Sequence, residues 1–127
     1  MIINYPRLKV NIDLPNGIYR FNNESATGKT RLCKALKTFH SYGEKVNSYT
    51  YNDKLDGKNI STVLSKEYKV ILLDRYDLYY GDGFDIMKDL ADKCIILLDC
   101  NRFITDFTDW DCCYIEMTAD TIEVRNE

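Results

Sequence analysis

Residues 23–30 decide the fold of this chain, and they read Asn23-Glu24-Ser25-Ala26-Thr27-Gly28-Lys29-Thr30. The segment before them, residues 17–21, is rich in apolar and aromatic side chains and predicts a strand. The segment after them has Leu32, Leu36 and Phe39 at helical spacing. The sequence therefore predicts a strand, a loop and a helix in succession.

The stretch differs by one residue from the phosphate-binding pattern G-x-x-x-x-G-K-[ST]. Gly28, Lys29 and Thr30 stand where the pattern requires them, and Asn23 replaces the first glycine. In such a loop, backbone N–H groups and a helix N-terminus hold a phosphate, the lysine reaches the terminal phosphates, and the threonine binds Mg²⁺. Asparagine is the best non-glycine substitute, because it tolerates left-handed backbone angles. The methyl group of Ala26 is a second departure, because it would crowd an approaching phosphate.

The pattern predicts that one set of residues lines a nucleotide site. Its members all belong to the loop or to the first turn of the helix, and they are Asn23, Ser25, Ala26, Thr27, Gly28, Lys29, Thr30 and Arg31.

Two later apolar runs, residues 69–74 (KVILLD) and 94–99 (CIILLD), each end in an aspartate. Such runs are typical of strands buried on both faces, and a polar group at the carboxyl end of a parallel strand faces the ligand crevice of an α/β sheet. Asp74 is therefore a candidate metal-site residue; the alternative is that it only starts a turn. After the second run, Asn101 suits a site better than Asp99, because a bare carboxylate would repel phosphate. A simple polar strand end remains the alternative there.

These motifs together resemble the P-loop NTPase superfamily. Residues 9–21 (KVNIDLPNGIYRF) resemble the hairpin that leads into the nucleotide site of ABC-type and related ATPases, and residues 70–79 (VILLDRYDLY) resemble their Walker B strand. The resemblance covers residues 9–101. It implies a three-layer α/β fold with a mainly parallel central sheet and an N-terminal β-hairpin over residues 7–22. The length predicts one domain over residues 1–127. Alternation in residues 113–124 predicts a C-terminal β-hairpin.

The resemblance implies that ATP and Mg²⁺ are the ligands. Lys29 would contact the β- and γ-phosphates, Thr30 and Asp74 would hold the metal, and Asp77 or Asn101 would position the attacking water. A glutamate usually follows the Walker B aspartate, and Arg75 stands there instead. The expected function is thus ATP binding with slow hydrolysis. The alternative is a catalytically inactive protein-binding module, for example a regulatory or inhibitory protein of a mobile element.

Composition and net charge limit the kinds of binding partner and the compartment that the sequence predicts. The chain has 127 residues, 45% of them hydrophobic, and a net charge of −3, which gives no support for nucleic-acid binding. No apolar run approaches the ~20 residues needed to span a bilayer. The five cysteines show no C-x-x-C spacing, which predicts reduced thiols in a cytoplasmic protein.

Three tyrosines lie shortly after the apolar run at residues 69–74. Tyr76, Tyr79 and Tyr80 would stack on a base or contact a protein partner; half-buried packing is the favoured alternative. Elsewhere, the patterns predict a strand over residues 46–51 and helices over residues 59–66 and 84–92.

Overall fold

The computed structural model describes residues 1–22, 26–100 and 111–126, with the backbone alone for residues 26 and 27. Its strands form one mixed sheet in the order β1-β2-β8-β7-β3-β6-β5-β4. The strands are β1 (Ile2–Tyr5), β2 (Leu8–Asp13), β3 (Gly17–Phe21), β4 (Val46–Tyr49), β5 (Val70–Leu73), β6 (Ile95–Leu98), β7 (Asp111–Met117) and β8 (Thr121–Asn126). The helices are α1 (Ala26–Ser41), α2 (Tyr51–Leu55) and α3 (Phe84–Leu90), with short 3₁₀ turns η1 (Ile60–Thr62) and η2 (Tyr76–Leu78).

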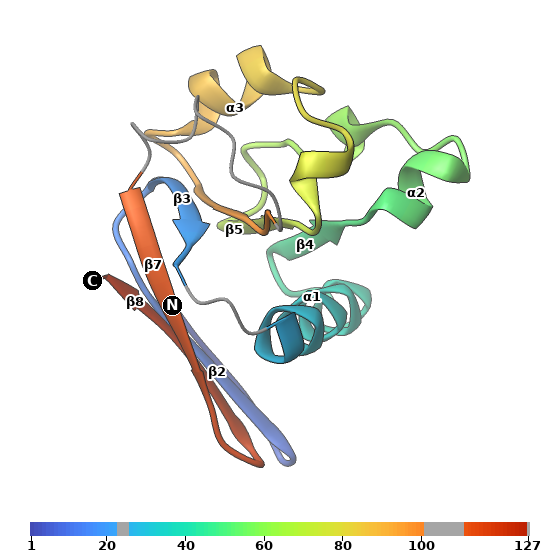
Figure 1. Ribbon diagram of the computed structural model, residues 1–127. Helices are drawn as coiled ribbons and strands as arrows, with labels where there is room; N and C mark the ends of the chain where they lie inside the picture. Colours follow the sequence, from blue (N-terminus) through green and yellow to red (C-terminus); the bar gives the residue numbers. More distant parts are fainter. Residues whose placement is uncertain (23–25, 101–110, 127) are drawn as a thin grey trace.

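The expectation of a three-layer α/β fold of the P-loop NTPase type was wrong. The eight-stranded mixed sheet curls into a half-barrel, and the described residues contain only three α-helices (Figure 1). Strands β2, β7 and β8 bury only alternate residues, such as Val10 and Ile12 in β2 and Ile122 and Val124 in β8. One face of this half of the sheet therefore has no covering layer, which suits the mixed pairing found there.

The expected N-terminal hairpin was also wrong. Strand β2 pairs antiparallel with β1 and parallel with β8, whereas β3 pairs parallel with β6 and β7. The connection between β2 and β3 is anchored elsewhere: Asn16 Nδ2 donates to the Asp92 carbonyl, and the Gly17 N–H donates to the Cys94 carbonyl. These bonds direct β3 toward β6 instead of back along β2.

The C-terminal hairpin was confirmed, since β7 and β8 pair antiparallel with Cys113 opposite Asn126. The expected helix over residues 59–66 was wrong, because only the single turn η1 forms there. The sequence did not suggest α2, which interrupts the expected strand over residues 46–51. Thr50 caps α2 by accepting from the Asp53 N–H while the Asp53 carboxylate accepts from the Thr50 N–H.

The neighbouring strands β3, β6, β5 and β4 are parallel, so their carboxyl ends meet at one edge of the sheet. Each of the central strands β5 and β6 is buried on both faces. Val70 and Leu72 pack in the cluster that includes α1, and Ile71 and Leu73 pack in the cluster that includes α3. Figure 1 shows α1 and α3 on opposite sides of this part of the sheet. No helix in the described ranges is long and apolar enough to cross a membrane.

Candidate functional site

A buried ion pair lies where α1 begins and β6 ends. Lys29 is on the first turn of α1, and Asp99 directly follows β6. Lys29 Nζ lies 3.5 Å from Asp99 Oδ1, and the two side chains are only 4% and 5% exposed. The ammonium also faces the Phe21 ring, 6.0 Å from its centroid. Burying both charges is costly unless they are paired, so the pair fixes the first turn of α1 against the carboxyl end of β6.

A second carboxyl group joins this pair. Asp74 directly follows β5, which is the neighbour of β6. Burial, then a hydrogen bond and charge repulsion from Asp99, raise the pKa of Asp74 to about 7. Near neutral pH Asp74 therefore keeps its proton for much of the time. Asp99 Oδ1 accepts no hydrogen bond from the residues that the structure describes.

Arg75, next to Asp74, adopts a left-handed backbone conformation with φ 49° and ψ 48°. It is the one non-glycine residue with positive φ in the described ranges. Such strain persists only where neighbouring contacts enforce it, and it is common at functional sites. The following Tyr76 N–H donates to the Asp99 carbonyl at 2.7 Å, which ties the turn after β5 to the end of β6.

Tyr79 stabilises the same turn, the one that follows β5. Its side chain is 2% exposed, and its hydroxyl lies 2.6 Å from the Asp74 carbonyl and 3.2 Å from the Tyr49 carbonyl. Its ring meets Tyr49 and Tyr76 edge to face. The phenol thus sets the position of the backbone that presents the Asp74 carboxyl group.

Replacing Tyr79 by phenylalanine removes this hydroxyl and leaves the Asp74 carbonyl without it. We expect the free energy of unfolding to fall by about 1–2 kcal/mol, because the partly buried Asp74 carbonyl and the buried contact with the Tyr49 carbonyl both lose their donor. Urea denaturation followed by circular dichroism measures the change. Tyr5→Phe is the matched control, since the Tyr5 hydroxyl bonds only the partly buried Glu44 carboxylate at 3.2 Å. Equal stability of Tyr79→Phe and wild type would contradict the role given to this hydroxyl.

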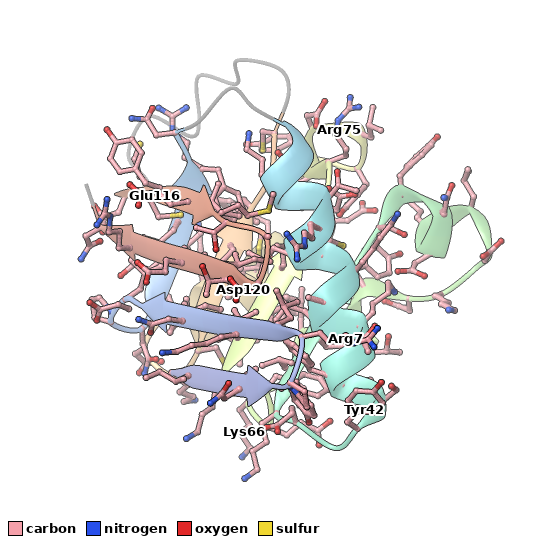
Figure 2. The ribbon with its side chains drawn as sticks, turned by 90° about the horizontal axis from the view of Figure 1, so that it is seen from below. Arg7, Tyr42, Lys66, Arg75, Glu116 and Asp120 are labelled. Atoms are coloured by element: carbon pink, nitrogen blue, oxygen red, sulfur yellow. The ribbon has the colours of Figure 1, made fainter. Side chains whose placement is uncertain are left out.

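A cavity of about 260 Å³ opens beside Asp74. Three elements supply its lining, namely the second turn of α1, the start of α2 and the end of β5. The lining residues are Thr30, Cys33, Lys34, Thr50, Tyr51, Asn52, Asp74 and Arg75. Figure 2 shows Arg75 beside the start of α1.

The structure brings together some of the residues that the sequence singled out. Thr30 and Asp74 line the same cavity, and Lys29 lies with Asp99. Gly28 is buried close to β7, where an added Cβ would lie 3.4 Å from Ile115 Cδ1. That distance is an ordinary van der Waals contact, so packing alone does not account for a glycine at position 28.

Other candidates are engaged elsewhere. Arg31 donates to the carbonyls of Thr118 and Ala119, at 3.0 and 2.6 Å, and so binds the β7–β8 turn. Asp77 has a fully buried side chain that accepts from Arg75 Nε and Nη2, at 3.2 and 3.1 Å.

The remaining candidates lie outside what the structure describes. They are Asn23, Ser25, the side chains of Ala26 and Thr27, and Asn101.

Sequence reasoning preferred Asn101 to Asp99 and did not pair Asp99 with Lys29. The signal was present, since residues 69–74 and 94–99 both end in leucine-leucine-aspartate and so end alike at one edge of the sheet. Lys34 and the residues at the start of α2 gave no such signal. Tyr76 and Tyr79 are buried in packing, while Tyr80 is 39% exposed.

Comparison of the chain with protein-family models, curated proteins and solved structures finds no match. Within the described ranges, no group of three or more histidine, cysteine, aspartate or glutamate side chains could hold a metal ion. The functional interpretation therefore depends on the geometry at the ends of β5 and β6.

Proposed function

We propose that the chain binds ATP with Mg²⁺ at the edge formed by the start of α1 and the ends of β5 and β6. The observation that carries this proposal is the buried contact of Lys29 with Asp99, beside the raised-pKa carboxyl group of Asp74. One ammonium and two carboxyl groups are expensive to bury, and apolar residues of similar volume would stabilise the fold at least as well. Perturbed titratable groups that share one edge of a sheet favour a ligand site.

The residues present fit Mg²⁺. This ion prefers oxygen ligands and typically takes one or two carboxylates, completing its shell with water and substrate phosphates. Thr30 and Asp74 supply a hydroxyl and a carboxyl group on one cavity wall, and Asp99 Oδ1 is a buried acceptor that receives no hydrogen bond from the described part of the chain. When bound, the ion would neutralise phosphate charge. Lys29 would contact the β- and γ-phosphates, following the resemblance of its loop to phosphate-binding loops.

Lys29 must exchange partners for this contact to form. Its ammonium lies with Asp99, so a phosphate competes with a carboxylate that is already in place. The competition lowers affinity for nucleotide alone, and it weakens once a divalent cation occupies the two carboxyl groups. We therefore propose that nucleotide binding depends strongly on Mg²⁺.

Hydrolysis is slow on this proposal. Arg75 follows Asp74 directly, and Asp77 is buried with its carboxylate held by the Arg75 guanidinium. A general base must reach the proton that it removes, and Asp77 would first have to leave Arg75. The cytoplasm is the compartment that we propose, because the five cysteines are free thiols.

The test is titration of the wild-type protein with a fluorescent ATP analogue, with Mg²⁺ and with the ion removed by EDTA. We expect saturable binding with Mg²⁺ and at least tenfold weaker binding without it, since a cation that holds both carboxylate and phosphate contributes about 1.4 kcal/mol or more. Absence of binding under both conditions would overturn the proposal.

That negative result would instead favour the second candidate, a catalytically inactive protein-binding module. The observation behind this candidate is that Lys29 and Asp77 both already have charged partners within the chain. In such a module the two ion pairs only stabilise the turns after β5 and β6.

A further inference from the structure

We propose that the cavity between α1, α2 and the end of β5 binds the oxyanion group of a small molecule that carries a phosphate or a carboxylate. This ligand is additional to the nucleotide. Lys29, which is assigned to the nucleotide phosphates, does not line the cavity. Thr30 and Asp74 line it, so an occupant lies directly beside the proposed metal position.

The first support is the presence of two cationic side chains on the cavity wall, which also carries the Asp74 carboxyl group. Lys34 is exposed and forms no hydrogen bond or ion pair within the described ranges. The Arg75 guanidinium, with its side chain 35% exposed, is the second cation of the lining. The Asp77 carboxylate accepts hydrogen bonds from Nε and Nη2 of Arg75. The third guanidinium nitrogen, Nη1, is a further donor group. A lysine and an arginine on one wall suit an oxyanion.

Neutral hydrogen-bonding groups complete the lining. Tyr51 and Asn52, at the start of α2, border the cavity with a phenol and a carboxamide, and Thr50 precedes them. Cys33 forms a buried part of the wall. A cavity with a few polar groups that converge on one region is the usual form of a small-molecule site.

A neighbouring cavity of about 290 Å³ makes a useful contrast. It is lined by two lysines, Lys37 and Lys58, but both pair with Asp53, at 2.7 and 3.4 Å. Both of its lysines thus share one carboxylate partner, which also caps α2. In the cavity beside Asp74, Arg75 also pairs with a carboxylate, that of Asp77, but Lys34 has no carboxylate partner within the described ranges. Lys34 is therefore the cation on which the proposal that this cavity accepts an external anion depends.

The experiment is a titration of ¹⁵N-labelled protein with inorganic phosphate and, separately, with malonate, in the absence of nucleotide and Mg²⁺. We expect saturable shifts of the amide signals of Thr50, Tyr51, Asn52 and Arg75 with at least one of the two anions. Shifts with phosphate alone assign a phosphorylated ligand, and shifts with malonate alone assign a carboxylated one; either supports the proposal. No saturable shift, or shifts centred on Gly28 and Lys29, would overturn it.

Single-residue variants test where the anion binds, and they distinguish this proposal from the proposed binding of ATP. Lys34→Gln should weaken anion binding about tenfold or more, which is the effect of losing one charge-assisted hydrogen bond. Lys66→Gln is the matched control, because Lys66 is exposed and lies at the opposite end of the molecule from Arg75 (Figure 2). Unchanged anion binding in Lys34→Gln would overturn the proposed site. Lys29→Ala should keep the anion-induced shifts, whether or not the wild-type protein binds nucleotide.

Discussion

Replacing Lys29 by alanine is expected to weaken binding of the ATP analogue about 100-fold. Removing one partner of a buried, hydrogen-bonded charge pair costs about 2–5 kcal/mol, and about 3 kcal/mol corresponds to that ratio of dissociation constants. Lys29 is 3% exposed, so water cannot replace its ammonium next to a bound phosphate. Fluorescence titration in the presence of Mg²⁺ measures the ratio.

The matched control for this variant is Lys45→Ala, which removes an exposed lysine just before β4. Circular dichroism at the titration temperature verifies that both variants are folded, because Lys29→Ala leaves Asp99 without its ammonium partner. A folded Lys29→Ala protein that binds the analogue as tightly as wild type would exclude Lys29 as a phosphate ligand.

The stability of the wild-type protein is expected to fall as the pH rises from about 5 to about 8 in Mg²⁺-free buffer. Burial and the neighbouring Asp99 raise the pKa of Asp74 to about 7 in the folded protein, from an ordinary value of 3.8. Between these two values the folded state keeps a proton that the unfolded state has lost, so each rise in pH favours unfolding. The loss ends above the folded-state pKa. Allowing for solvent screening of a partly exposed carboxyl group, we expect a decrease of about 1.5 kcal/mol in the free energy of unfolding.

Asp74→Asn tests the origin of this pH dependence. An amide cannot ionise, so the variant should lose most of the decrease and be more stable than wild type at about pH 8. Urea denaturation at both pH values measures the four free energies. Asp53→Asn is not a suitable control, because Asp53 caps α2 and pairs with two lysines. Asp85→Asn on the exposed first turn of α3 is suitable. A wild-type decrease that persists in Asp74→Asn would assign the titration to another group.

The sequence was a good guide where local pattern determines structure. The runs at residues 70–73 and 95–98 are strands buried on both faces, as their apolar composition indicates. Alternation in residues 113–124 correctly predicted the last two strands and their antiparallel pairing. Helix α1 follows β3, as the spacing of Leu32, Leu36 and Phe39 requires.

The overall fold was not predictable from the same patterns, because it depends on pairings between distant segments. Residues 8–13 pair with residues 121–126, and no local signal indicates that partner. The resemblance of residues 9–21 to a hairpin led to the wrong pairing for β2. The curled sheet has β2 paired with β8 instead.

Within the site, the sequence identified Lys29, Thr30 and Asp74 but undervalued Asp99. Charge repulsion was the reason for preferring Asn101, and that reasoning treated both aspartates as ionised. The proton that Asp74 keeps near neutral pH and the ammonium of Lys29 beside Asp99 remove most of the repulsion. The left-handed conformation of Arg75 has no sequence signal, since arginine is not a residue that favours it.

The most direct test of the central proposal is an amide chemical-shift map of the ¹⁵N-labelled protein titrated with ATP and Mg²⁺ together. The account predicts saturable shifts that include Gly28, Lys29, Thr30, Asp74 and Asp99, at the start of α1 and the ends of β5 and β6. A spectrum that does not change, or whose changes lie away from these three elements, would contradict it.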